Sequence, residues 1–304
     1  MKAPVLAELE KRFGKSRRLE KSKSMYRFGN DDVFIYFRYS KFHKGKTLFY
    51  GLRSDDLQQL EGRCAWICFL WDGQTEPVFV PFQEYEEIFR SAKPARDGQI
   101  KVHLRIGNDG LDRSLPKVGR FSLDPHIGWE SLDDAVTNRT SQNLPAMSHT
   151  QIQLWLSVIG MVKNFDVWIP LADRPKVRAL DSIRESFIQT LPTGFEQVQA
   201  ILSQVDVLWL ERGSSRLGAL FEVEHSTTIY SGLLRLNDVR LVAPNMEPTF
   251  SIVADDERRS DFLRQVNRPT FQRSGLSDIC RFMKYEDIFS WHSRTTKSGS
   301  PITS

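Results

Sequence analysis

The sequence predicts an α+β protein, in which a β-barrel-like domain is followed by an α/β domain built on a central mixed sheet. Three observations support this prediction. Short aromatic and β-branched runs fill residues 25–122, an aperiodic stretch follows in residues 123–147, and strand-like segments alternate with helix-like segments over residues 148–290. Alternating strands and helices are typical of a sheet covered by helices. The length of 304 residues also exceeds a single typical core, which favours two domains.

Composition excludes several classes of protein. Hydrophobic residues make up 40% of the chain and charged residues 26%, which is ordinary for a globular protein and unlike a disordered or fibrous one. No segment approaches the roughly 20 apolar residues of a membrane-spanning helix, and the N-terminus is charged where a signal peptide would be apolar. We therefore expect a cytoplasmic protein. Its three cysteines are too few for a paired disulfide framework.

Both ends of the chain are expected to lie outside the folded domains. Residues 1–24 hold eight Lys or Arg side chains against three Glu, and we interpret them as a basic arm. Such an arm could neutralise nucleic-acid phosphates, or it could be a solvated tail without a partner. Residues 291–304 are interpreted as a disordered tail.

The first domain is predicted from strands that turn residues separate. The strand segments are VFIYFRYS, KTLFYGL, CAWICFLW, PVFVPF and IKVHLRI. Asn, Asp and Gly bound these segments, which indicates a mostly antiparallel barrel or sandwich. A helix is expected at FQEYEEIFRSA. The stretch 123–147 combines Pro, Gly, Asn and Ser without a steady period, and we interpret it as a linker.

The second domain opens with a helix over residues 148–159. Ser148 can cap this helix, and Gly160 is expected to end it. The elements expected after it are, in order, a strand at DVWIP, helices within residues 175–203, strands at VDVLWL and LGALFEVE, a helix over residues 226–242, a strand at TFSIVA, a helix over DERRSDFLRQV and a strand near ICRFMKY.

The strands VDVLWL and LGALFEVE carry the candidate chemistry. The segment ERGSSR between them suits a hairpin loop, so we expect the two strands to pair antiparallel. Side chains alternate along a strand, which places Glu222 and Glu224 on one face. Asp206 would lie opposite Phe221 or Glu222, and this one-residue difference in register decides whether Asp206 shares the face of the glutamates.

Three converging carboxylates repel one another unless a cation lies between them, and hard oxygen ligands suit Mg²⁺, with Mn²⁺ as the alternative. The segment after them, which begins with His225 and Ser226, opens a helix whose free amides could hold a phosphate. A metal, a phosphate and a water-activating group together indicate phosphodiester hydrolysis. Alternatively, Glu222 and Glu224 form the solvated face of an amphipathic strand. The apolar residues around them instead favour buried strands, in which a carboxylate is costly unless it is paired or binds a metal.

The string DVLWL…FEVEHSTTIYSGLLRL resembles the PD-(D/E)XK nuclease core of restriction enzymes. Asp206 lies fifteen intervening residues before Glu222, and a helix is expected on each side of the hairpin. The resemblance covers residues 148–285. It implies a restriction-endonuclease-like fold and a Mg²⁺-dependent endodeoxyribonuclease that hydrolyses DNA through a metal-activated water. The first two acids bind the metal in that family, which implies Asp206 and Glu222 as ligands.

The third motif position is usually Lys and is here Glu224, which the resemblance makes a catalytic residue. Some restriction enzymes carry Glu at that position and still cleave. Many members also carry an acid on the first helix, where this chain offers Gln151 and Gln153. At best Gln153 could hydrogen-bond a metal-bound water. His225 and Ser226 are candidates for a phosphate contact or for tuning Glu224, and Arg235 and Arg240 on the next helix are interpreted as solvent or interface charges.

A nuclease core by itself recognises little, so we expect residues 25–122 to select the DNA site. Basic residues are interleaved there with aromatic residues, and the loop cations are better candidates for DNA than the aromatics, which are expected in the core. The expected DNA contacts are Arg38, Lys41, Lys44, Lys46 and Arg53. The expected partners are double-stranded DNA, a second copy of the chain in a homodimer and a companion methyltransferase.

Two other functions remain open. The chain could be a DNA-binding protein whose nuclease-like domain is catalytically silent, or an interaction module with a β-rich partner-binding domain and no nuclease activity. The third motif position, here Glu224, is the feature that discriminates between the restriction-type endonuclease and the silent DNA-binding protein.

Overall fold

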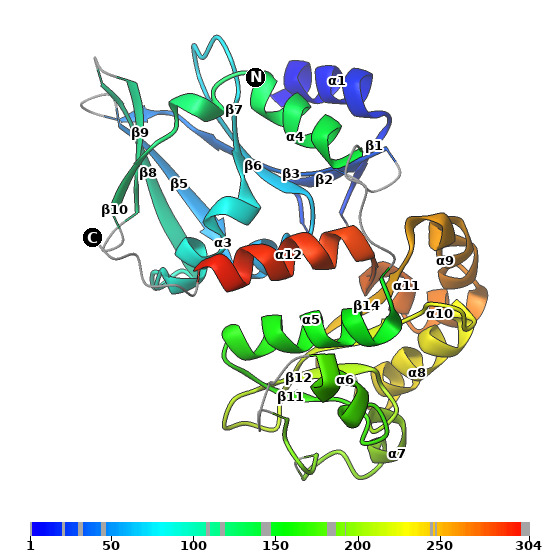
Figure 1. The fold of residues 1–304 in the computed structure, drawn as a ribbon. Helices are drawn as coiled ribbons and strands as arrows, with labels where there is room; N and C mark the ends of the chain where they lie inside the picture. The colour runs from blue at the N-terminus through cyan, green and yellow to red at the C-terminus, as the bar shows by residue number, and fades with distance from the viewer. Residues whose placement is uncertain are drawn as a thin grey trace. The chain divides into compact units, whose positions relative to one another are not determined.

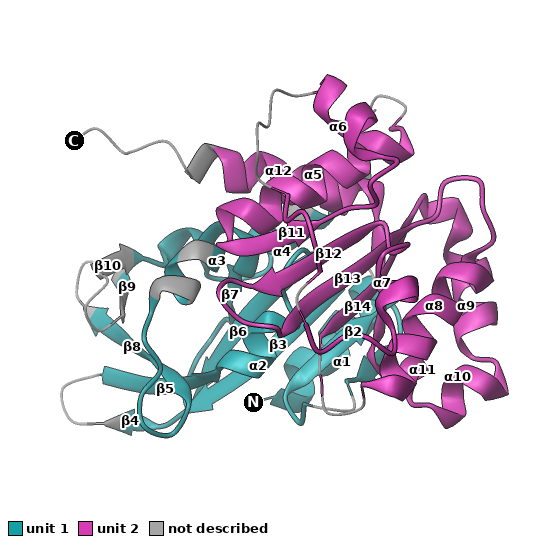
Figure 2. Cartoon of the chain, turned by 90° about the horizontal axis from the view of Figure 1, so that it is seen from below, with its two compact units in different colours: residues 1–143 teal, residues 144–304 magenta. Residues whose placement is uncertain are grey.

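The structure is a computed structural model of the 304-residue chain (Figure 1). It describes residues 2–19, 22–29, 33–43, 47–107, 110–115, 119–140, 147–180, 187–191, 193–243, 246 and 248–298. The chain divides into two compact units, Met1–Asn143 and Leu144–Ser304 (Figure 2). Within the described ranges, no helix is both long enough and apolar enough to cross a membrane.

The first unit contains ten strands and several short helices. Its elements are α1 (Lys2–Phe13), β1 (Ser16–Arg18), β2 (Met25–Phe28), β3 (Val33–Ser40), β4 (Phe42–His43), β5 (Thr47–Arg53), α2 (Ser54–Gln58), β6 (Ala65–Trp71), β7 (Val78–Pro81), α3 (Phe82–Ser91), β8 (Gln99–Gly107), β9 (Gly110–Leu115), β10 (Gly119–Ser122), the 3₁₀ helix η1 (Asp124–His126) and α4 (Glu130–Thr140). The five predicted strands correspond to β3, β5, β6, β7 and β8, and the predicted helix corresponds to α3, whereas the sequence did not predict the short strands β1, β2, β4, β9 and β10.

Two five-stranded sheets form the first unit. One has the strand order β1-β2-β3-β6-β7 and is mixed, because β3 and β6 are parallel; the other has the order β10-β9-β8-β5-β4 and is antiparallel. Apolar side chains from one face of each sheet share a core, as Tyr36, Ile67 and Val102 illustrate. The described strands therefore build a sandwich of open sheets. Of the two expected forms, a barrel or a sandwich, the described strands form the sandwich, and the barrel-like form is not observed among them.

The predicted basic arm and linker are largely folded. Helix α1 buries Val5 and Leu9 against the outer face of the first sheet, and β1 pairs with β2. Two of the basic side chains take part in this packing: the Lys2 amino group lies 4.4 Å from the ring centroid of Tyr26, and the Arg12 guanidinium lies 4.6 Å from that of Trp129. The linker stretch contains η1 and α4. Both segments have few apolar residues and no strong hydrophobic period. The sequence therefore did not indicate that they fold.

The second unit alternates helices and strands, as the sequence predicts. Its elements are α5 (His149–Val162), β11 (Phe165–Trp168), α6 (Arg174–Leu180), α7 (Gln199–Leu202), β12 (Val207–Glu211), β13 (Leu217–Val223), α8 (Ile229–Val242), β14 (Thr249–Ala254), the 3₁₀ helix η2 (Asp256–Arg258), α9 (Arg259–Val266), α10 (Pro269–Arg273), α11 (Leu276–Ile279), β15 (Cys280–Lys284) and α12 (Tyr285–Ser298).

One mixed sheet of order β11-β12-β13-β14-β15 organises the second unit. The pairs β11/β12 and β12/β13 are antiparallel, whereas β13/β14 and β14/β15 are parallel. Helices α5 and α12 cover one face of the sheet and α8 to α11 the other, so apolar side chains of every strand are buried between helices (Figure 1). Strands β13, β14 and β15 end at the same edge of the sheet at which β12 begins. This edge carries the candidate site.

Two helix boundaries differ from the predictions. Helix α5 continues through Gly160 to Val162, and Asn164, with φ 65°, follows its last turn. A Cβ at position 160 would lie 2.5 Å from the Trp209 indole nitrogen. Gly160 therefore allows α5 to pack closely against Trp209 and does not end the helix. The predicted tail is helical through Ser298, because α12 buries Trp291 on the sheet. The rest of the predicted tail, residues 299–304, lies outside the described residues.

Candidate functional site at the edge of the sheet in the second unit

The hairpin of β12 and β13 brings the three predicted carboxylates to one edge of the sheet. Val207 pairs with Phe221 in the antiparallel register, so the next position back along β12 places Asp206 opposite Glu222. Side chains alternate along each strand, and Asp206, Glu222 and Glu224 therefore share the face covered by α8. The predicted antiparallel hairpin is confirmed, and of the two registers the one with a shared face is observed.

Both glutamates are buried. Glu222 is 0% exposed and Glu224 is 1% exposed, so the alternative of a solvated strand face is wrong. Burial raises the pKa of each carboxyl group, and the charge of Asp206 raises both further. Two buried glutamates on one strand end are costly for stability unless polar partners or a ligand compensate them.

Glu222 is compensated by an arginine of α8. The Nε and Nη2 atoms of Arg235 donate hydrogen bonds of 2.8 and 2.6 Å to the two carboxylate oxygens of Glu222. This two-pronged pair occupies both oxygens. The prediction that Arg235 is a solvent or interface charge is wrong, because helix α8 packs across β13 and turns this side chain toward the sheet.

Asp206 has a backbone partner and a histidine partner. Its Oδ2 accepts a 2.7 Å hydrogen bond from the amide of Val223, which ties the start of β12 to the end of β13. Its Oδ1 lies 3.3 Å from Nε2 of His149, the first residue of α5. Burial lowers the pKa of His149, but the hydrogen bond and the charge of Asp206, with those of Asp173 and Glu224, outweigh it and raise the pKa. The charge of Asp206 thus favours the charged form of the His149 imidazole.

Glu224 has one satisfied oxygen and one unsatisfied oxygen. The Thr227 hydroxyl donates a short hydrogen bond to Oε2, while Oε1 is buried and has no hydrogen-bond partner among the described residues. Arg258 holds the backbone of this segment, because its guanidinium donates bonds of 2.7 and 2.5 Å to the carbonyl oxygens of Glu224 and Thr227. An unpaired buried carboxylate oxygen is a natural position for a bound cation or water.

Gly232 of α8 gives the carboxylates room, and replacing it should disturb them. A Cβ at position 232 would lie 2.5 Å from Glu224 Oε1 and 3.1 Å from Glu222 Cβ. An exposed helical Gly→Ala change normally stabilises a protein, but we expect Gly232→Ala to lower the free energy of unfolding by about 1–3 kcal/mol through overpacking. Urea unfolding measures this, with Leu234→Ala at an exposed position of the same helix as control. A stabilised Gly232→Ala variant would contradict the close approach of α8.

Helix α5 contributes a second side chain. Gln153 is buried, and its Nε2 lies 3.3 Å from the Asp206 carbonyl oxygen and 3.4 Å from Asp173 Oδ2. Its Oε1 is buried without a partner. The predicted contact of Gln153 with a metal-bound water stays a prediction, with this oxygen as its candidate atom. Sequence reasoning missed His149, although it lies four residues before Gln153 on the helix that Ser148 caps, so helical spacing could have found it.

The segment after Glu224 differs from its prediction. Helix α8 begins at Ile229, so His225 and Ser226 precede its first turn and are exposed. The His225 ring lies against Tyr285 at 6.2 Å between centroids, and its Nδ1 is 3.4 Å from the tyrosine hydroxyl oxygen. His225 thus has a structural contact with Tyr285. The phosphate contacts predicted for His225 and Ser226 stay predictions.

The side chains of this edge fit a divalent cation, although the described residues contain no group of three or more His, Cys, Asp or Glu side chains arranged as ligands. Each carboxylate instead turns to its own partner: Asp206 to the Val223 amide and His149, Glu222 to Arg235, Glu224 to Thr227. Asp206 and the unpaired Oε1 of Glu224 offer the hard oxygen donors that Mg²⁺ prefers.

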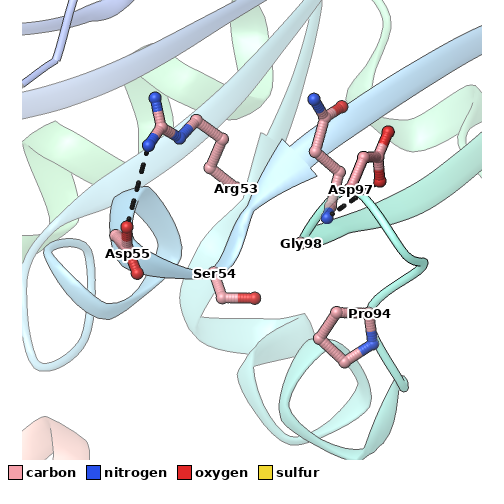
Figure 3. Close-up of a pocket in the computed structure, with 7 residues that line it drawn as sticks. Arg53, Ser54, Asp55, Pro94, Asp97 and Gly98 are labelled. Atoms are coloured by element: carbon pink, nitrogen blue, oxygen red, sulfur yellow. Dashed lines mark hydrogen bonds and ion pairs between the residues drawn. The ribbon is translucent and has the colours of Figure 1, made fainter.

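Of the DNA contacts predicted in the first unit, Lys44 and Lys46 lie outside the described residues. Lys41 is exposed, and the Arg38 guanidinium lies 5.4 Å from the ring centroid of Tyr36. Arg53 lines an open polar pocket of about 470 Å³ (Figure 3). The other residues that line this pocket are Ser54, Asp55, Pro94, Asp97, Gly98 and Gln99.

Acidic neighbours compensate cations at this pocket. Arg53 Nη2 lies 3.8 Å from Asp55 Oδ2 (Figure 3). The Lys101 amino group contacts Asp97. The pocket therefore has no strong positive excess, and DNA contact by Arg53 stays a prediction.

Comparison with known proteins covers mainly the second unit. Residues 133–297 match the family model described as the Type II restriction enzyme NmeDI C-terminal domain. The Type II restriction enzyme NmeDI of Neisseria meningitidis serogroup C is 33% identical over 132 residues, which cover 41% of this chain and 37% of that protein. The aligned part thus spans little more than a third of that relative's length. No solved structure matches the chain. Since the family model covers more than half of its residues, the chain belongs to the NmeDI C-terminal domain family.

Proposed function

We propose that this chain is a metal-dependent DNA endonuclease of the restriction type, with a PD-(D/E)XK-like core in its second unit. The observation that carries the proposal is the group of three carboxylates, Asp206, Glu222 and Glu224, on one face at the end of a β-hairpin. This hairpin lies within the residues that match the restriction-enzyme family. Carboxylates that converge in this way favour a bound cation between them, and a divalent cation beside a phosphate supports hydrolysis.

Each carboxylate has a role in the proposed reaction. A bound Mg²⁺ or Mn²⁺ would supply the positive charge that polarises the scissile phosphate and acidifies the attacking water. Asp206 and Glu222 are proposed to hold this ion. Glu224, with Oε1 unpaired, is proposed to accept the proton of the attacking water or to add a ligand oxygen. A bond then forms between the water oxygen and phosphorus, a phosphorus–oxygen ester bond breaks, and the leaving oxygen takes up a proton from solvent.

The first unit is proposed to select the DNA site, because a hydrolytic centre by itself provides little sequence readout. The family model covers only the last residues of this unit, so the role rests on its folding as a separate compact body with exposed cations such as Lys41 and Arg53. A homodimer, a companion methyltransferase and a cytoplasmic location stay predictions.

One observation favours the alternative of a catalytically silent DNA-binding protein. Arg235 occupies both oxygens of Glu222, so one of the two predicted ligands is not available to a metal in this arrangement. In that alternative the ion pair is permanent and replaces the metal as the compensation for Glu222.

Cleavage of plasmid DNA distinguishes the two functions. The purified chain should convert supercoiled plasmid to linear fragments with Mg²⁺ and leave it intact with EDTA, because the proposed chemistry needs the cation. Unmodified and methylated plasmids should both be used, since base modification could be required or could block cleavage. Binding of both DNAs without cleavage under any divalent metal would favour the silent alternative.

A further inference from the structure

The site lacks a positively charged side chain at the third motif position, which usually provides one. Lys is usual there, and Glu224 adds a negative charge instead. Burial raises the pKa of Glu224, and the charges of two described arginines, Arg235 and Arg258, act in the opposite direction. Arg258 is bonded to two backbone carbonyl oxygens, those of Glu224 and Thr227. Arg235 is bonded to a carboxylate that is itself a proposed metal ligand.

Arg235 lies between the buried carboxylate and solvent. Its side chain is 30% exposed, whereas Glu222 is 0% exposed. Helix α8 is fixed by Leu233 and Leu236, which are fully buried in the core on this face of the sheet. A rearrangement here would therefore involve the long Arg235 side chain and leave the helix in place. The guanidinium fork that matches a carboxylate also matches two oxygens of a phosphate.

We propose that Arg235 and the divalent cation are alternative partners of Glu222, and that the guanidinium released from Glu222 binds the scissile phosphate of DNA. This inference rests on the proposed function. It explains how a chain with Glu224 at the third position can still present a positive charge to the phosphate.

A permanent Glu222–Arg235 ion pair is the competing explanation. Buried ion pairs often have a purely structural role, and removing one partner then destabilises the fold. Loss of stability or activity in a single Arg235 variant would therefore not by itself separate the two explanations. The position of the guanidinium when metal is added does separate them.

Nuclear magnetic resonance of arginine side chains reports that position directly. The full chain, labelled with ¹⁵N in arginine, would be titrated with Mg²⁺ while the Nε–H signals are recorded; an Arg235→Lys variant assigns the Arg235 signal by its loss. Arg174 serves as internal control, because its Nε donates a 3.3 Å hydrogen bond to the Ile169 carbonyl oxygen. We expect the Arg235 signal to shift with Mg²⁺ and the Arg174 signal to stay unchanged.

Cleavage kinetics provide the second readout. Arg235→Met should lower kcat by about a hundredfold, the usual effect of losing one donor to a transition state. Arg235→Lys should recover much of this loss because it keeps the charge. Arg240→Met, at another arginine of α8, is the matched control and should have a much smaller effect on kcat.

The outcomes separate this inference from the proposed function. An Arg235 signal that stays unchanged at Mg²⁺ concentrations that support cleavage would overturn the exchange of partners and leave the nuclease proposal standing. Equal kcat values for Arg235→Met and the unmodified chain would overturn the phosphate contact. A chain that neither cleaves DNA nor binds metal would overturn both proposals.

Discussion

Asp206→Asn is expected to lower the rate of DNA cleavage by at least about a thousandfold while the fold is kept. The asparagine side-chain oxygen can still accept the hydrogen bond that Asp206 Oδ2 accepts from the Val223 amide, so the junction of β12 and β13 should remain closed. The substitution removes the negative charge that we assign to holding the cation, and it places an amide nitrogen beside His149 in place of Oδ1. An alanine at this position would lose both the charge and the hydrogen bond, which makes asparagine the sharper change.

Single-turnover cleavage with saturating Mg²⁺ measures this effect, and thermal unfolding checks the fold. Asp166→Asn is the matched control, because Asp166 belongs to the same sheet and its partner is Arg212, at 3.4 Å. DNA binding by Asp206→Asn should stay within a few-fold of that of the unmodified chain. A variant that cleaves at the normal rate would remove Asp206 from the site.

Glu224→Gln should reduce cleavage by about a hundredfold to ten-thousandfold, the range associated with losing a general base. Glutamine keeps the size of the side chain, and its oxygen can accept the Thr227 hydrogen bond in place of Oε2. It cannot take a proton from water at neutral pH, and it is a weaker metal ligand. The loss should appear in kcat more than in KM, because DNA binding does not depend on this buried oxygen.

The rate for Glu224→Gln should be followed as pH is raised, since burial and the charge of Asp206 hold the pKa of Glu224 above its ordinary value. The unmodified chain should gain activity with pH as this carboxyl group loses its proton, and the variant should lack that part of the profile. Glu211→Gln is the control, because Glu211 is a half-buried glutamate of β12 that pairs with Arg216. Normal cleavage by Glu224→Gln would show that the carboxylate is a bystander.

The strands and the hairpin of the second unit could be predicted because their signals are local. Continuous apolar runs such as those of β12 and β13 indicate buried strands, and the polar segment ERGSSR between them indicates a tight connection. The alternation of side chains then places Glu222 and Glu224 together without any knowledge of the tertiary fold. The register of Asp206 could not be predicted from the sequence. The pairing of β12 with β13 is irregular between Trp209 and Leu210, and such an irregularity allows more than one pairing.

The partners of the carboxylates could not be predicted, because they come from elements distant in the sequence. Arg235 reaches Glu222 only because α8 crosses β13, and His149 reaches Asp206 only because α5 begins at the same edge of the sheet. Gly160 was misjudged for a similar reason. Considered by itself, a glycine at this position predicts the end of a helix. Its packing against Trp209 is a tertiary contact, which the local sequence does not indicate.

Binding of Mn²⁺, followed by electron paramagnetic resonance of the free ion, tests the central claim most directly. The claim is that the edge formed by β12 and β13 holds a divalent cation between Asp206 and its neighbouring glutamates. The full chain should remove Mn²⁺ from solution in a saturable manner without DNA. The double variant Asp206→Asn, Glu224→Gln should lose this binding, and Asp166→Asn should keep it. Mn²⁺ binding that is unchanged in the double variant, or absent from the unmodified chain, would contradict the account.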